Sequence, residues 1–575
     1  MSSRTKLPLR PLAALLAATL ILPACGPGGS TQANGLSTPT PLPITEADAT
    51  RFLARASFGA TGAASSELRA LGYARWIERQ QGLPVTELLP GLLELGCSFV
   101  VDPDCEEDNI DPHIDLLNRL WWGHAVYADD QLRQRVAFAL SEIFVVSFFN
   151  AELAEYPTML ADYYDALARG AFGNYRDLLE TITLHPAMGI YLSMIRNRKE
   201  DPVAGTRPDE NYAREVMQLF SIGLVRLDAN GQPLLDPLSG ATVPTYDQHD
   251  ITELARVFTG WTFASEETPS ASLDAFTGLA PSVLPMQAWP AFHDDGAKLI
   301  LDDVFVPAGL NPADELDLAL DALANHPNVG PFLSRQLIQR LVTSNPSPAY
   351  IGRVAAVWAD DGAGQRGNLA AVVCAILLDG EALASGSDPS FGKVREPVQR
   401  VTALWRAFDG ELLPGSDAFG GFDAQENLGQ QALYSPSVFN FFSPSYATTA
   451  LAQQGLVGPE LQIMTHATLT SQSGFLTELV FEGNSAVVEA GSEWGLPVLQ
   501  VGELQSLAGN VPALLSHLDT HLLGGTLSGP TRDALAAYLE GIDLASGDPG
   551  VPDGLERALI ALATLIDTPD YLVQK

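Results

Sequence analysis

The sequence predicts a mainly α-helical protein that forms one large compound domain. Three observations support this prediction. Long segments repeat apolar residues at helical spacing, alternating strand patterns are scarce, and hydrophobic residues make up 46% of the 575 residues, enough for a large core. Two Pro- and Gly-rich insertions, residues 226–246 and 262–310, interrupt the helices, and we expect only a few short strands within them.

The expected helical domain covers residues 45–575. A long apolar helix is predicted over 132–149, and two helices follow that break near Gly170–Gly173. A helix over 210–222 starts with acidic residues and stops at Gly223. The next is expected to start at Asp250, with Glu253 completing a capping box. Later helices are predicted at 314–325, 329–343, 347–359, 367–379, 395–408, 459–482, 510–522, 530–541 and 553–566, and a C-terminal subdivision near residue 450 is an alternative to one unit.

The first 24 residues have the layout of a lipoprotein-type signal peptide. Three basic residues precede an apolar stretch of about 14 residues, too short to span a bilayer comfortably. The tetrapeptide "LPAC" resembles a lipobox, so we expect lipidation of Cys25; ordinary signal cleavage nearby is the alternative. Residues 25–44 then form a flexible linker. These features predict a bacterial envelope protein, periplasmic or surface-exposed, attached to the membrane by acyl chains.

Charge and cysteine content narrow the set of partners. Acidic residues outnumber basic ones 69 to 32, and the formal charge of −37 repels nucleic acid, so no nucleic-acid partner is expected.

Cys97 and Cys105 are spaced for a disulfide in an oxidising compartment. Cys374, within "LAAVVCAILL", is expected to be a buried free thiol. No Cys-x-x-Cys pair exists, which excludes cysteine zinc sites and thioredoxin-like redox motifs.

The segment "HDDGAK", residues 293–298, is the first candidate for chemistry, because GxSxG, HExxH, GxxxxGK[ST] and GxGxxG are all absent. His293, Asp294 and Asp295 are residue types that bind divalent metal ions or transfer protons. Consecutive side chains rarely point at one atom, and Asp-Asp-Gly is also a common turn sequence. Spacing alone favours the turn, and a metal or catalytic site is the alternative.

The helix expected over 210–222 provides a second candidate. At 100° per residue, Asn211, Arg214, Glu215 and Gln218 share one face of this helix. That face is either a solvated surface with ordinary i,i+4 pairs or a polar stripe along a cleft. In the second interpretation Arg214 binds a carboxylate or phosphate. Spacing again favours the first.

Two segments, 178–192 and 318–333, share the pattern His-Pro-x-x-Gly-x-[Tyr/Phe]-Leu. His185 and His326 are expected to cap helix ends beside their prolines. A chance recurrence of this helix break is favoured over an old duplication.

The motifs taken in order resemble those of the bacterial DUF1800 family, over about residues 45–575. The family usually has Asn where Asp209 stands in "DENY", a mild departure. The motifs that carry the resemblance are "RFLARASFGAT", "LRQRVAFALSEIFVVS", "LLETITLHPAMGIYL", "PDENYAREVMQLFSIGL", "YDQHDITELARVFTGWT", "HDDGAK", "HPNVGPFLSRQLIQRLV", "GNLAAVVCAILLD", "GKVREPVQRVTAL", "SPSVFNFFSPSY" and "TPDYLVQK".

The resemblance implies a large, often exported protein without an established activity. Genes of this family often neighbour genes for DUF1501 proteins, which look like members of the alkaline phosphatase and sulfatase superfamily. The signatures HDxGxK and NYARE recur in the family. They make His293, Asp295, Lys298, Arg214 and Glu215 the site candidates that the resemblance implies.

Two functional hypotheses follow. The first is a non-catalytic accessory or binding protein of the cell envelope that works with a secreted, hydrolase-like DUF1501-type partner and binds through a surface that includes residues 435–446. The second is a metal-assisted hydrolase with a divalent metal cofactor. In this second hypothesis His293, Asp294 and Asp295 act as ligands or acid–base groups, and Arg214 orients an anionic substrate. A cleft between HDDGAK and the Asn211–Glu215 stripe would favour it.

Overall fold

The computed structural model describes residues 43–95, 114–266, 268–384, 390–489, 492, 494–545 and 552–575. Within these residues the chain is mainly helical, as predicted, and its short strands form three two-stranded antiparallel sheets. No helix in this part of the chain has the length and apolar character needed to cross a bilayer. Cys25, Cys97 and Cys105 lie outside the described residues, so the predicted lipidation and disulfide stay predictions.

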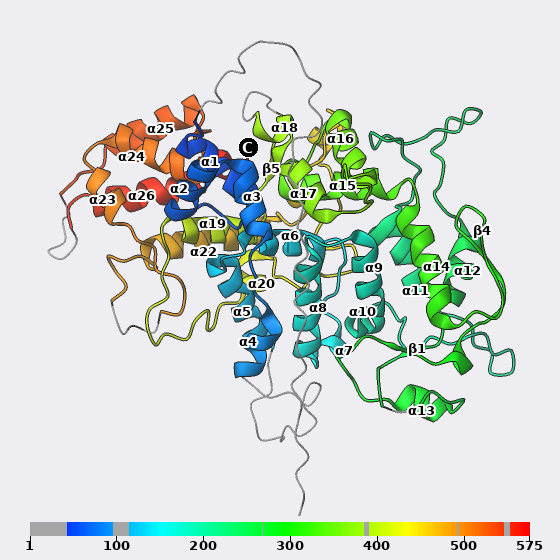
Figure 1. The fold of residues 1–575 in the computed structure, drawn as a ribbon. Helices are drawn as coiled ribbons and strands as arrows, with labels where there is room; N and C mark the ends of the chain where they lie inside the picture. The colour runs from blue at the N-terminus through cyan, green and yellow to red at the C-terminus, as the bar shows by residue number, and fades with distance from the viewer. Residues whose placement is uncertain are drawn as a thin grey trace, which may run out of the picture.

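Helices from both ends of the chain lie on one side of the molecule, where the blue α1 and α2 are beside the orange and red α24–α26 (Figure 1). Helix α1 starts after Thr45, which forms a capping box with Asp48. The helices of the first part are α1 (Glu46–Ala56), α2 (Gly62–Leu71), α3 (Tyr73–Gln81), α4 (Leu88–Leu95), α5 (Ile114–Tyr127), α6 (Gln131–Ser141), α7 (Ala151–Ala154), α8 (Pro157–Gly170), α9 (Tyr175–Leu184) and α10 (Pro186–Tyr191).

The opposite side of the molecule carries the two insertions and the helices next to them (Figure 1). Insertion 226–246 holds isolated β-bridges, and insertion 262–310 holds two hairpins and a short helix. The elements are α11 (Asn211–Glu215), η1 (Val216–Ser221), α12 (Gln248–Val257), β1 (Trp261–Thr262), α13 (Leu273–Gly278), β2 (Gln287–Ala288), η2 (Pro290–Phe292), β3 (Lys298–Ile300) and β4 (Val304–Val306).

The remaining elements complete the hydrophobic core. One continuous hydrophobic cluster extends from Ala49 to Tyr571 and includes residues on both sides of position 450. The elements are α14 (Pro312–Asn325), α15 (Val329–Leu341), α16 (Pro348–Ala359), α17 (Leu369–Leu378), α18 (Gly380–Leu383), β5 (Lys393–Val394), α19 (Pro397–Ala407), α20 (Ala424–Leu428), α21 (Thr449–Ala452), η3 (Pro459–Gln462), α22 (His466–Phe481), α23 (Gly502–Leu507), α24 (Val511–Leu518), η4 (Asp519–Leu523), α25 (Gly529–Glu540), α26 (Leu555–Ile566), α27 (Pro569–Leu572) and β6 (Val573–Gln574).

Four local predictions are wrong. Helix α6 ends at Ser141 and not at 149, because the apolar residues that follow are buried in a non-helical segment, and an apolar run alone does not distinguish the two. The 210–222 helix is α-helical only to Glu215 and then widens into the π-helical η1. Helix α12 starts one turn early, with Asp247 as its cap and Asp250 completing the box. Cys374 is buried, as expected, but it is disulfide-bonded and not a free thiol.

The predicted histidine caps are confirmed. The Nδ1 atom of His185 accepts the backbone N–H of Ala187 at 3.2 Å, and the Nδ1 atom of His326 accepts that of Asn328 at 3.1 Å. Each Nε2 atom lies 3.2 Å from an aspartate, Asp162 and Asp302 respectively. The two His-Pro breaks therefore share one geometry.

Candidate functional site

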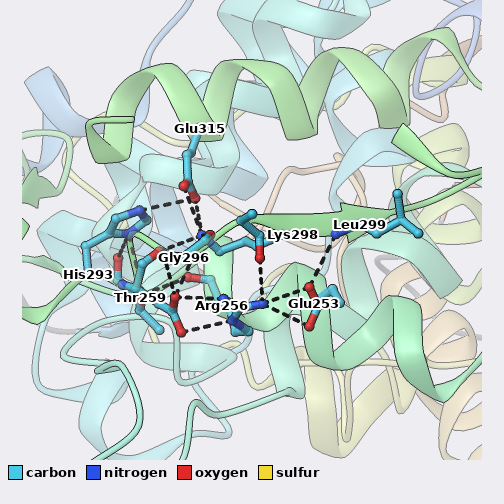
Figure 2. Close-up of polar contacts among 10 residues, drawn as sticks. Glu253, Arg256, Thr259, His293, Gly296, Lys298, Leu299 and Glu315 are labelled. Atoms are coloured by element: carbon cyan, nitrogen blue, oxygen red, sulfur yellow. Dashed lines mark hydrogen bonds and ion pairs between the residues drawn. The ribbon is translucent and has the colours of Figure 1, made fainter. Parts of the chain in front are cut away.

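The HDDGAK segment leads from the η2 turn into β3 and anchors the β3–β4 hairpin. Helix α12 and helix α14 both contact this hairpin (Figure 2). In the antiparallel register Lys298 pairs with Val306, and Ile300 pairs with Val304. The side chains of Lys298, Ile300 and Val306 are buried, so the inner face of the hairpin is held against the helices.

The side-chain ammonium of Lys298 is fully hydrogen-bonded. Its Nζ atom lies 2.7 and 2.9 Å from the two carboxylate oxygens of Glu315, in the first turn of α14. It also donates to the backbone carbonyls of Asp294 at 2.5 Å and Gly296 at 2.9 Å. Both side chains of the ion pair are 0% exposed. A buried ion pair of this kind is stable only because each partner has its hydrogen bonds, and here every donor of the ammonium has an acceptor.

His293 lies beside the same carboxylate. Its side chain is 1% exposed, and Nδ1 lies 2.9 Å from the carbonyl oxygen of Thr259. Because a carbonyl only accepts, Nδ1 carries the proton. The Nε2 atom lies 3.2 Å from Glu315 Oε2 but lacks the geometry of a hydrogen bond. The imidazole is therefore packed inside the cluster and oriented by Thr259, just after the end of α12.

Asp294 pairs with Arg256 of α12. The two carboxylate oxygens accept hydrogen bonds from Nε and Nη2 of Arg256, both at 2.9 Å, so the pair is bidentate. Burial would raise the pKa of Asp294, but the hydrogen bonds and charge of Arg256 outweigh it and lower that pKa. A Cβ atom at Gly296 would come within 2.6 Å of Arg256 Nη2, which explains the glycine at this position.

Asp295 differs from its neighbours because its side chain is exposed and forms no hydrogen bond or ion pair with the described residues. In this part of the chain no group of three or more His, Cys, Asp or Glu side chains is arranged to hold a metal. The structure therefore does not bring His293, Asp294 and Asp295 together as a ligand set. Asp294 is committed to Arg256, and Lys298 to Glu315.

The second candidate lies apart from the first. Arg214 pairs with Glu210 at 3.1 Å, and Glu210 also accepts from Gln248 and Thr252 of α12. Glu215 is 6% exposed; its burial raises its pKa, and the charge of Arg214 opposes this shift. No hydrogen bond or ion pair among the described residues links Arg214 or Glu215 to HDDGAK. Helix α12 packs against both α11 and β3, so each candidate is attached to it separately.

Sequence reasoning missed the partners that define the HDDGAK cluster. Glu315 lies 17 residues beyond Lys298, and its acidic turn indicated only the start of a helix. Arg256 lies 38 residues before Asp294 on the polar side of α12. Lys298 in β3 and Glu315 in α14 are too far apart in sequence to form a recognisable local motif. They meet only because the chain folds back between the hairpin and the helix. Only Arg256 is reflected in the motif itself, because its side chain lies so close to position 296 that a residue without a Cβ atom, glycine, is found there.

The helices, the two insertions and the β3–β4 hairpin together define a large α-helical protein. Its most prominent motif, HDDGAK, is an internal anchor: it attaches this hairpin to α12 and α14 through ion pairs. The comparisons agree with this class. The chain belongs to the DUF1800 family, described as a protein of unknown function, and the family model matches residues 51–573. No curated protein and no solved structure matches the chain.

Proposed function

We propose that this chain is an exported, lipid-anchored envelope protein that acts by binding, as the accessory of a secreted, hydrolase-like DUF1501-type partner. The observation that supports this proposal is an exposed apolar surface on the two insertions. We call it the insertion surface: Leu234, Leu235 and Leu238 on one insertion, and Leu299, Val304 and Phe305 on the other.

The two parts of the insertion surface are tied together. Asp302, in the turn between β3 and β4, forms an ion pair with Arg226 at the base of the first insertion, and its carboxylate lies 3.2 Å from Nε2 of His326. Leu299 and Phe305 are paired across the strands. Leu238 is 96% and Phe305 64% exposed, although both side chains are large and apolar. Exposed apolar side chains on two insertions that are joined by an ion pair are typical of protein interaction sites.

The HDDGAK cluster contributes to this function through position. It holds the inner face of β3 and β4 so that Leu299 and Phe305 point outward. A binding surface on a fixed hairpin loses little conformational entropy when a partner docks, which favours affinity. A signature motif can therefore serve binding without touching the partner.

The experiment for the proposed partner uses a purified DUF1501-type protein. The two purified proteins are expected to form a complex in isothermal titration. Phe305→Ser and Leu238→Ser should each weaken it about tenfold or more, as expected for central apolar contacts. Leu544→Ser, at an apolar residue that is 41% exposed in the C-terminal part, is the matched control and should leave affinity unchanged. No complex, or a complex insensitive to both variants, contradicts the proposal.

The lipid anchor has its own test. Cys25→Ser should move the protein from the membrane fraction to the soluble envelope fraction, because the acyl chains are its only proposed attachment. Retention of the variant in membranes would contradict this part of the proposal.

The hydrolase alternative gains no support from the geometry, because Asp294 and Lys298 already have protein partners. Metal analysis of the purified protein, beside His293→Ala and Asp295→Ala, distinguishes the two functions. Stoichiometric metal that is lost in both variants would favour the hydrolase. Unchanged metal content would remove it.

A further inference from the structure

A cavity of about 510 Å³ lies under the loop 435–446, away from the HDDGAK cluster. Its walls come from four distant segments of the chain: Glu142 and Ile143 just after α6, the π-helical η1 with the residues just after it, helix α15, and the loop itself. This volume lies within the range of sites that bind small organic molecules. Such cavities are mostly apolar and contain a few polar groups that fix orientation.

Most of the wall is apolar. Leu219 of η1, Phe332 of α15, and Val438 and Phe439 of the loop contribute side chains to it. Phe439 is 54% exposed, so one side of the opening carries an aromatic ring that contacts solvent. An apolar chain that entered here would remove this ring and its neighbours from water, and the gain is about 25 cal/mol for each Å².

Arg335 is the unusual group in this wall. It is half-buried, and it forms no hydrogen bond or ion pair with any of the described residues. Burial lowers the pKa of its guanidinium, and no nearby carboxylate raises it again. Other buried arginines without a carboxylate partner, such as Arg395 and Arg406, donate to backbone carbonyls, whereas Arg335 has no acceptor of either kind among the described residues. A desolvated cation is stabilised by an anion that reaches it.

The next residue on α15 adds a second donor. Gln336 also lines the cavity, is 7% exposed, and its Nε2 group has no hydrogen-bond partner within the described chain. Its carbonyl oxygen already accepts from Arg340 at 3.4 Å, which fixes the amide group. A buried N–H group without an acceptor costs free energy that a ligand oxygen would recover.

We propose that this cavity binds an amphiphilic anion. Its carboxylate or phosphate head lies on the Arg335 guanidinium and the Gln336 amide, and its apolar chain lies along Leu219, Phe332 and Phe439. The head group requires an acceptor-only anion, because both protein groups are donors. The chain requires a flexible apolar body, because the wall consists of several separate aliphatic and aromatic side chains.

The direct test is isothermal titration of the purified protein with dodecanoate below its micelle concentration. One site is expected, with a dissociation constant on the order of 10 µM. Acetate carries the head alone, and dodecyltrimethylammonium carries the chain with a cationic head; both should bind at least about tenfold more weakly. Dodecyl phosphate distinguishes the two head groups, and tighter binding of it would assign the phosphate. Absence of saturable binding for both anions up to about 1 mM, or equal binding of the cation, overturns the proposal.

Variants locate the site. Arg335→Gln should lower the affinity for the preferred anion about tenfold or more, since a charge-assisted hydrogen bond is lost. Arg207→Gln removes the same charge from a side chain that is 85% exposed and should change nothing. Gln336→Leu should have a smaller effect in the same direction. Circular dichroism and the thermal midpoint establish that each variant is folded; if Arg335→Gln is not, Arg335→Lys replaces it and should also weaken binding. Unchanged affinity in a folded Arg335 variant overturns the proposal.

Discussion

The cluster around Lys298 lies in the interior and the half-buried Arg335 lies in the wall of a cavity, and the charged groups of the two regions are paired in opposite ways. At Lys298 every ammonium donor has an acceptor, and Asp294 is held by a bidentate arginine. At Arg335 the guanidinium has no partner among the described residues, and the neighbouring amide leaves a donor unused. The two ion pairs of the first arrangement are complete without a ligand, although Nε2 of His293 beside them has no hydrogen bond to the described residues, whereas the proposed ligand would supply the partner that the second arrangement lacks.

This difference teaches how to distinguish an anchor from a site. Buried polar groups in native proteins are nearly always hydrogen-bonded, so a saturated cluster indicates a structural role however reactive its residue types are. Unpaired buried donors in the wall of a cavity are the exception that requires an explanation. The family resemblance favoured HDDGAK as the place for function, and hydrogen-bond geometry favours α15.

The largest effect should follow from breaking the anchor. Lys298→Met leaves the carboxylate of Glu315 buried without its cation, so we expect a loss of about 3–5 kcal/mol in the free energy of unfolding. Urea denaturation at pH 7 measures it. The double variant Lys298→Met/Glu315→Leu should recover most of the loss, and Asp295→Asn, in the exposed position of the same motif, should stay within about 0.5 kcal/mol. A Lys298 variant as stable as the wild type would refute the anchor.

A smaller effect is expected where the chain enters the cavity wall. Gly223 follows η1 with φ of +69°, and a Cβ atom there would come within 2.6 Å of Phe332. Gly223→Ala should therefore cost about 2 kcal/mol, from the left-handed backbone and from displacement of the ring. Gly240 has φ of +70° and open space around it, so Gly240→Ala isolates the backbone part, about 1 kcal/mol. Equal losses in the two variants would show that Phe332 tolerates the contact.

The smallest effect concerns Glu142, a buried carboxyl group in the same cavity wall. Burial and the charge of Glu396 raise its pKa well above 4.5. The folded protein therefore retains a proton that the unfolded chain has lost, and this contribution to stability falls as pH rises above about 4.5. Glu142→Gln does not ionise, so it should change the free energy of unfolding at pH 5 by less than about 1 kcal/mol and flatten its decline toward pH 8. Glu155→Gln, at an exposed residue, is the control, and an unchanged pH slope in Glu142→Gln would contradict the assignment.

The fold could be predicted from the sequence where periodicity and caps agree. The helices expected at 314–325, 329–343 and 347–359 are α14, α15 and α16, each within a few residues, because apolar spacing and nearby prolines mark them. Prediction failed at η1, where a π-helical segment changes the angle between residues and separates Arg214 from Gln218. Gln218 lines the cavity, whereas Arg214 pairs with Glu210.

The candidate site was predictable only in part. The sequence identified HDDGAK as a special segment, but the structure has no hydrogen-bonded turn at 293–297 and no positive φ at Gly296, and the partners on α12 and α14 gave no local signal. Arg335 was not identified at all. Its importance depends on the absence of a hydrogen-bond or ion-pair partner for its guanidinium among the described residues. A sequence pattern does not show which distant segments approach a side chain, and so it does not show such an absence. The loop 435–446 was expected to contribute a binding surface, and it forms one wall of the cavity.

The assembly of the cavity from distant segments has a consequence for folding. The ion pair at Lys298 closes a loop of 17 residues, so its loop-closure entropy is small and it can form early. The hydrogen bond from Asn440 to Glu142, which joins the loop 435–446 to the wall, spans 298 residues. Contacts of such separation form late, because most of the chain must first be ordered. A ligand bound there would stabilise the finished protein relative to every partly folded form.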